Sequence, residues 1–195
     1  DGLFKMWYGG GRKPNELAYA TSKDGSNFTK QKQLSFNLKA VNDMHVVHDR
    51  NANRYYQYYW HRAAKPKSRL VRVGSDNETD FEFDKPEEIF IEDEEYPGRY
   101  IFSHVLLEGR KWYMFYGNFV PYTHCVNATV RMATSDDGLN WKLVNNNILP
   151  GLDAEVVKLK DELYAMYFAP QGYYDRADAD IRLAVYKGSL DDMPR

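Results

Sequence analysis

The chain has 195 residues, 43% of them hydrophobic and 28% charged, with a net charge of −2. This composition can build a core and is too apolar for a disordered chain. The near-neutral charge excludes the basic surface that nucleic-acid phosphates require. No apolar run approaches the roughly 20 residues that cross a bilayer. We therefore expect one folded domain, residues 1–195, with no nucleic-acid or membrane partner.

Localisation is unknown from the sequence. No signal peptide opens the chain as given, and a secreted or periplasmic location is compatible with it. Cys125 is the single cysteine, so an intrachain disulfide and a cysteine zinc site are excluded.

Aromatic segments recur along the chain and predict strands. In chain order they begin at Phe4, Tyr56, Trp112 and Tyr164. Each is followed by a second period-2 segment, at residues 17–22, 70–75, 130–135 and 181–186. A short β-branched run precedes three of them, at residues 45–48, 104–107 and 155–158. Alternation with aromatic and β-branched enrichment is typical of β-strands, and a repeat of about 50 residues is typical of propeller blades.

Turn segments support the repeat. Residues 22–28 read Ser-Lys-Asp-Gly-Ser-Asn-Phe and residues 135–141 read Ser-Asp-Asp-Gly-Leu-Asn-Trp, while a weaker copy ends at Asp80-Phe81. Asp-Gly between strands predicts a tight turn. The interpretation is an all-β chain, a β-propeller of four-stranded antiparallel blades, with repeats at residues 1–36 (partial), 37–92, 93–149 and 150–195 (partial).

About three and a half blades fit in this length, and the first copy shows no β-branched run before its aromatic segment. We expect either part of a longer propeller or a ring completed by oligomerisation. Exposed strand edges favour association, so a homo-oligomer is an expectation.

Carboxylates and histidines gather at the heads of the β-branched runs. Aligning the runs places His45, His104 and Glu155 at one position, with Asp43 and Asp153 two residues earlier. Because side chains alternate along a strand, both positions are expected to face one channel mouth. Two opposed carboxylates are what glycoside hydrolysis uses, one as acid and one as base or nucleophile. The alternative is that these groups only cap loops.

Substrate contacts are expected from His45, Arg99, Tyr122 and Tyr174, since arginine binds anionic sugars and tyrosine stacks on sugar rings. The alternative for Arg99 is a solvated surface position. Residues 92–95, an acidic run, are expected to form a solvated loop. Two histidines without a defined local spacing do not specify a metal site. No cofactor is expected, with a channel ion such as calcium as the alternative.

The sequence resembles the five-bladed propeller glycoside hydrolases, which include arabinanase/xylosidase, invertase/levansucrase and anhydro-galactosidase groups. The resemblance rests on residues 4–8, 17–25, 43–47, 131–141 and 153–157, and covers nearly the whole chain. It implies three acidic groups at the heads of successive inner strands, and Asp43 and Asp153 match such heads, with Glu155 as a second candidate. His104 stands where a third carboxylate is expected, which implies a proton donor or an orienting group.

Together these features predict a glycoside hydrolase acting on a poly- or oligosaccharide by carboxylate acid/base catalysis. Asp43, Asp153, Glu155 and His104 are the predicted catalytic residues. The alternative is a non-catalytic carbohydrate-binding or assembly module with the same fold.

Overall fold

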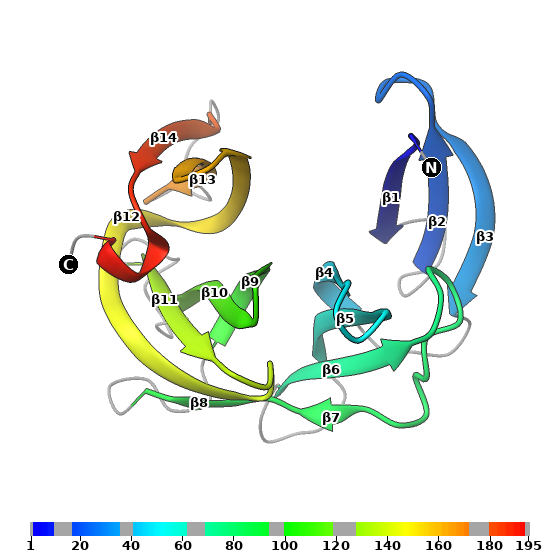
Figure 1. Cartoon of the computed structure of the whole chain (residues 1–195), viewed down its shortest axis with the longest axis horizontal. Coiled ribbons are helices and arrows are strands. Elements are labelled where there is room, and N and C mark those ends of the chain that lie inside the picture. Colours follow the sequence, from blue (N-terminus) through cyan, green and yellow to red (C-terminus); the bar gives the residue numbers. More distant parts are fainter. Residues whose placement is uncertain are drawn as a thin grey trace. The chain divides into compact units, whose positions relative to one another are not determined.

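A computed structural model describes residues 2–9, 17–35, 41–61, 69–93, 100–118, 128–171 and 180–193. The chain divides into two compact units, Asp1–Glu88 and Ile89–Arg195, and both consist mainly of antiparallel β-strands (Figure 1). Within the described ranges, no helix is both long enough and apolar enough to span a membrane.

The first unit contains two sheets of sequentially adjacent antiparallel strands. The first sheet, here called the first blade, consists of β1 (Phe4–Gly9), β2 (Leu17–Ser22) and β3 (Thr29–Ser35). The second blade consists of β4 (Val41–Asp49), β5 (Arg54–His61), β6 (Arg69–Ser75) and β7 (Glu87–Glu88). Trp7 of the first blade packs against a buried cluster of the second blade that contains Tyr59, Val71, Val73 and Phe81.

The second unit is organised around one long strand. Its strands are β8 (Phe90–Glu92), β9 (Tyr100–Glu108), β10 (Lys111–Asn118), β11 (Thr129–Ser135), β12 (Asn140–Lys160), β13 (Leu163–Pro170) and β14 (Arg182–Lys187). The curved strand β12 pairs with β11 as far as Pro150 and with β13 from Gly151 onward (Figure 1). We call β9, β10, β11 and the first half of β12 the third blade. The second half of β12 with β13 and β14 is the fourth blade, and β8 pairs in parallel with the start of β12.

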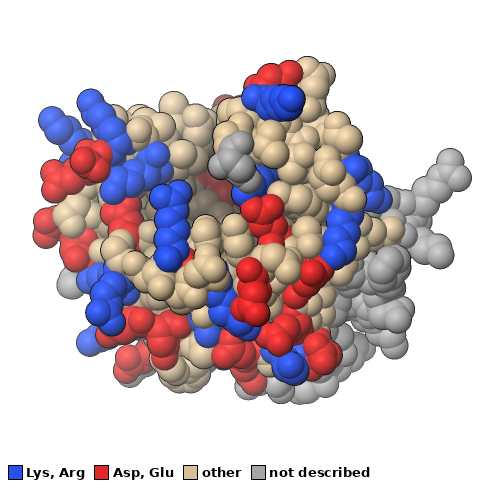
Figure 2. All heavy atoms as spheres, turned by 45° about the vertical axis from the view of Figure 1, so that its right-hand side comes forward, with Lys and Arg blue, Asp and Glu red and all other residues tan. Residues whose placement is uncertain are grey.

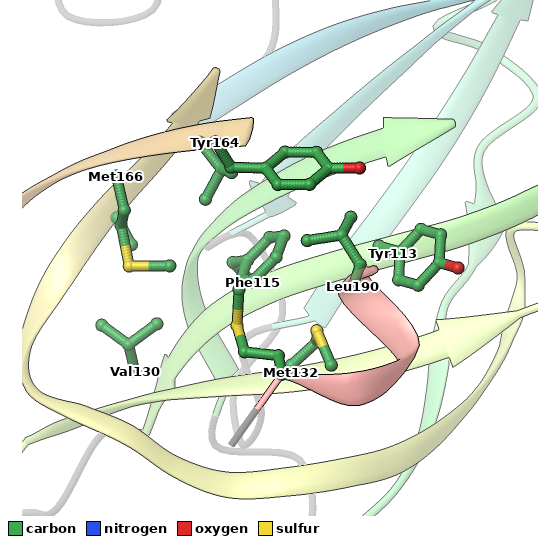
Figure 3. Packing of buried hydrophobic residues seen from close by; sticks show 10 residues of the cluster. Tyr113, Phe115, Val130, Met132, Tyr164, Met166 and Leu190 are labelled. Atoms are coloured by element: carbon green, nitrogen blue, oxygen red, sulfur yellow. The ribbon is translucent and has the colours of Figure 1, made fainter. Parts of the chain in front are cut away.

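The core of the second unit lies between the third and fourth blades. Phe115 and Met132 of the third blade are 0% and 2% exposed, and they pack against Tyr164 and Met166 of the fourth (Figure 3). Leu190, in the short 3₁₀ turn η2 (Leu190–Asp192), closes one side of this cluster. The cluster excludes water on one face of each blade, which is the packing that alternating strands require.

The register corrects the alignment of the second repeat by one residue. The fourth residue of the aromatic segment pairs with the third residue of the following segment in every blade, as Trp7–Tyr19, Tyr58–Arg72, Phe115–Met132 and Tyr167–Leu183. The second segment therefore begins at Tyr55, and the prediction of Tyr56 was wrong. Tyrosines occupy residues 55, 56, 58 and 59, so aromatic character alone fits either start, and only cross-strand pairing decides.

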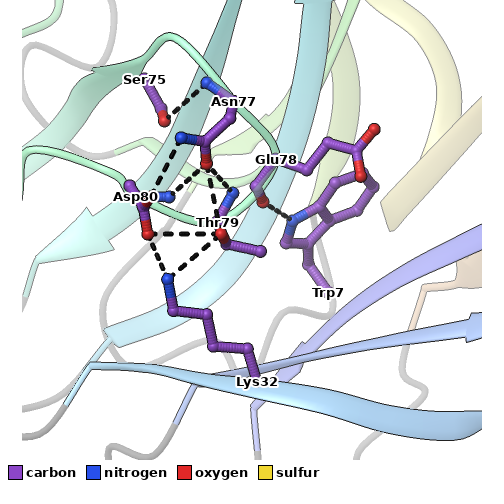
Figure 4. Close-up of polar contacts among 7 residues, drawn as sticks. All are labelled: Trp7, Lys32, Ser75, Asn77, Glu78, Thr79 and Asp80. Atoms are coloured by element: carbon purple, nitrogen blue, oxygen red, sulfur yellow. Dashed lines mark hydrogen bonds and ion pairs between the residues drawn. The ribbon is translucent and has the colours of Figure 1, made fainter.

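Three turns share one hydrogen-bonded design. In the first, Asp24 accepts hydrogen bonds from the backbone N–H groups of Ser26 and Asn27, and Ser22 Oγ accepts from Gly25. The turn after β11 repeats these bonds around Asp137. In the turn after β6, Asn77 takes the aspartate's place and accepts from the N–H groups of Thr79 and Asp80 (Figure 4). The weak third copy in the sequence is therefore the same structural motif.

Charges of both signs are interspersed on the surface drawn in Figure 2. In the first unit, Arg54 forms ion pairs with Asp76 and Glu82, and Lys85 also contacts Glu82. Exposed pairs of this kind each contribute at most about 1 kcal/mol to stability. These ion pairs therefore add little to the folding free energy of the first unit.

Candidate active site

A bulge of the same kind occurs in the first strand of three blades, just before the aligned histidine or glutamate. At each bulge, two residues of that strand lie opposite one residue of the next strand. The two bulged residues are 43 and 44 on β4, 102 and 103 on β9, and 153 and 154 on β12. Bulges are common beside active sites, because the extra residue bends the strand and redirects nearby side chains.

After each bulge the three aligned residues hold one register position. His45 pairs with Tyr58, His104 with Phe115 and Glu155 with Tyr167. The bulge also interrupts the alternation on which the prediction of a common facing relied. Asp153 and Glu155 are separated by a bulged residue, so a strict period of two does not describe them.

His104 and Glu155 form a close polar pair at these strand heads in the second unit. Nδ1 of His104 lies 2.6 Å from Oε2 of Glu155, a distance typical of a charge-assisted hydrogen bond. The imidazole is buried, with 6% of the side chain exposed, whereas 61% of the Glu155 side chain is exposed. An ionised Glu155 makes the imidazole Nδ1–H the donor. The Nδ1 proton of the buried His104 imidazole therefore lies beside a Glu155 carboxylate that is exposed to solvent.

Asp153 occupies an unusual backbone conformation at the β12 bulge. Its φ angle is +53°, in the left-handed region that residues other than glycine rarely adopt. The residue is half-buried, and protein atoms enclose its Oδ1. Strained backbone often accompanies functional sites, since the surrounding fold must hold it in place. The position of Asp153 two residues before Glu155 predicted it as a site residue. Its backbone conformation could not be predicted in this way, because the only indication in the sequence is that aspartate tolerates a positive φ.

Asp93 corrects the prediction for the acidic run 92–95. Its side chain is 0% exposed, and Oδ2 accepts hydrogen bonds from Arg131 Nη1 at 2.9 Å and Tyr116 Oη at 3.0 Å. A buried carboxylate requires such partners, because an unpaired charge is costly away from water. The prediction of a solvated loop was therefore wrong at this position, where the residue after β8 is fixed to β10 and β11. Hydropathy could not reveal this, because the partners lie 23 and 38 residues further along the chain.

The remaining predicted site residues are only partly described. Asp43 lies in β4, and the structure describes its backbone but not its side chain. His45 is half-buried in the same strand. Arg99, Tyr122 and Tyr174 lie outside the described ranges. In the second unit, the candidate site that the structure describes consists of His104, Asp153 and Glu155.

Comparison with known proteins finds similarity at the level of structure. No protein-family model matches the sequence, and no curated protein matches it. A thermostable family-43 glycoside hydrolase superposes with a TM-score of 0.77 at 17% identity, over 100% of this chain and 70% of its own. An endo-1,4-beta-xylanase from Bacteroides thetaiotaomicron gives 0.68 at 15% identity, over 100% of this chain and 67% of its own.

A GH32 beta-fructofuranosidase from Bombyx mori gives a TM-score of 0.63 at 13% identity, over 98% of this chain and 44% of its own. The chain therefore has the fold of the five-bladed propeller glycoside hydrolases. The predicted all-β propeller of antiparallel blades is confirmed, with this chain spanning part of a full propeller's length.

Proposed function

We propose that this protein hydrolyses a glycosidic bond in a poly- or oligosaccharide by acid/base catalysis. The observation that carries the proposal is the short contact between His104 and Glu155. Glu155 follows Asp153, whose backbone is strained, by two residues. These groups lie on a fold that the chain shares with glycoside hydrolases. Paired carboxylates and a proton donor are the groups that glycoside hydrolysis needs.

In the proposed chemistry the pair of His104 and Glu155 carries one acidic proton, held by Glu155 as a carboxylic acid or by His104 as an imidazolium beside the ionised carboxylate. Glu155 delivers this proton to the leaving glycosidic oxygen as the bond to the anomeric carbon breaks, and the pair is left as a carboxylate that the buried neutral imidazole orients. Asp153 is the second carboxylate. It takes a proton from the water whose oxygen bonds to the anomeric carbon, or it bonds to that carbon itself and is then displaced by water. The reaction needs no cofactor in this form.

The test measures sugar release from a panel of plant, algal and microbial glycans and aryl glycosides. We expect release by the parent chain, and a loss of at least about 100-fold in Asp153→Asn and in Glu155→Gln, since positioned acid/base groups contribute about 10²–10⁴ in rate. Asp43→Asn tests the carboxylate predicted on β4 in the same way. Asp161→Asn is the matched control, because this aspartate is fully exposed in the turn after β12 and should leave the rate unchanged.

Circular dichroism of each variant separates lost chemistry from lost folding. If the folded parent releases no sugar, or if the carboxylate variants match Asp161→Asn, the hydrolase proposal is wrong. Glycan binding without release would then support the alternative, a carbohydrate-binding or assembly module.

A further inference from the structure

The backbone carbonyl oxygen of Ala128 is a shared acceptor in the second unit. The N–H of Gly151 donates to it at 3.0 Å, and the side-chain amide Nε2 of Gln171 donates to it at 2.9 Å. A carbonyl oxygen has two lone pairs and can accept both bonds at once. Ala128 directly precedes β11, Gly151 is where β12 changes partner, and Gln171 directly follows β13. One oxygen therefore joins three segments that are far apart in the sequence.

Apolar packing surrounds this acceptor. Ala128, Leu152 and Ala169 form a buried cluster, in which Leu152 is 0% exposed. Leu152 pairs with Ala169 across β12 and β13. Apolar contact is not directional, so it holds these segments together without fixing their orientation. Hydrogen bonds depend on angle as well as distance, so the two bonds to Ala128 fix the orientation of β12 at this point.

The anchored stretch of β12 leads directly into the candidate site. Gly151 lies two residues before Asp153, whose φ angle is +53° and which begins the bulge. Glu155 follows the bulge and contacts His104 at 2.6 Å. A strained backbone conformation persists only where the surrounding structure holds it. The bonds to Ala128 hold the chain before the bulge, and the contact with His104 holds it after the bulge.

We propose that Gln171 is a positioning residue for the carboxylates of Asp153 and Glu155, and that it acts through the Ala128 carbonyl oxygen. This inference rests on the proposed glycoside hydrolase function and adds a residue to it. The Gln171 amide bonds to a backbone oxygen, so it acts on the shape of the site and not on proton transfer. Loss of this donor allows the strand before the bulge to shift, and a displacement of about 1 Å in a catalytic group can lower the rate about 100-fold.

The first test needs no sugar. NMR of the protein with nitrogen-15-labelled histidine reports the Nδ1–H of His104, and the signal is assigned by its loss in His104→Gln. We expect this proton to exchange with water at least about tenfold faster in Gln171→Met, because a displaced Glu155 protects it less well. Methionine keeps the length of the side chain and removes the amide donor. Gln31→Met is the matched control, since Gln31 donates its amide to the Thr29 carbonyl oxygen at 3.2 Å from an exposed position in the first unit.

The second test measures steady-state sugar release by the folded variants. Gln171→Met should lower kcat at least about tenfold and leave KM within about twofold of the parent value, because the catalytic groups shift while the substrate contacts stay. Gln31→Met should match the parent in both constants. Circular dichroism and urea melts establish that each variant is folded at the assay temperature.

The outcomes separate this inference from the proposed function. Unchanged Nδ1–H exchange in Gln171→Met, or the same change in Gln31→Met, would overturn the positioning role. A folded Gln171→Met with the parental kcat would overturn it as well. Faster exchange in Gln171→Met alone would support the positioning role even if the parent released no sugar, and in that case only the hydrolase proposal would be wrong.

Discussion

At the residue scale, an aspartate and an asparagine exchange places between equivalent turns. Asp137 accepts a hydrogen bond from the Asn140 amide at 2.8 Å, whereas Asn77 donates its amide to Asp80 at 3.0 Å. Burial by itself raises the pKa of Asp137, but hydrogen bonds from Asn140 and Leu139 outweigh it and hold the pKa well below its usual range. The stability from this carboxylate is therefore present above its unfolded pKa and lost as pH falls through the lower folded value.

This exchange predicts a coupling that urea unfolding can measure. Asn140→Asp should destabilise the chain by about 1 kcal/mol, because it places two carboxylates in contact. Adding Asp137→Asn should restore most of that loss, since the pair then matches Asn77 and Asp80. If the two changes are simply additive, the pair does not act as a hydrogen-bonded unit.

At the scale of the element, β12 serves two blades because glycine lies where it changes partner. A Cβ atom on Gly151 would lie 2.6 Å from the Ala169 carbonyl oxygen and 2.8 Å from the Phe168 ring. The first contact is with backbone, so a side-chain rotation cannot relieve it. Close approach of two strands at this position therefore requires glycine.

We expect Gly151→Ala to lower the free energy of unfolding by about 1–3 kcal/mol, as overpacking does in other cores. Gly9→Ala is the control, because a Cβ there would meet Met44 at an ordinary 3.8 Å. Denaturant melts of both variants check this. Equal stability of the two would mean that β12 shifts freely at its crossover.

At the scale of the whole molecule, buried tyrosines couple folding to alkaline pH. Burial, with the hydrogen bond to Glu78 as a second cause, raises the pKa of Tyr19 to about 12, and burial raises the pKa of Tyr59 to about 12. Burial likewise raises the pKa values of Tyr58, Tyr113 and Tyr164. The unfolded value is about 10. The stability held by these neutral hydroxyls is therefore full below pH 10 and is lost as pH rises toward 12.

Absorbance at 295 nm and circular dichroism recorded together test this expectation. Part of the tyrosine ionisation should be delayed past pH 10 and should coincide with the loss of β-sheet signal. The chain in denaturant should titrate near pH 10 throughout. Full ionisation near pH 10 with the sheet signal intact would contradict the burial of these hydroxyls.

The amino-acid pattern by itself determined the repeat, the strands and the turns. Alternating aromatic residues and Asp-Gly pairs act locally, so residues 17–22 and 130–135 could be recognised without a structure. The alignment of His45, His104 and Glu155 also depended only on strand pattern.

Tertiary structure alone decided the register at Tyr55, the bulge that carries Asp153 and the burial of Asp93. Each depends on partners from other strands, and a one-residue change in pairing leaves the local pattern almost unchanged. The contact between His104 and Glu155 joins residues 51 positions apart, so only the folded chain brings them together.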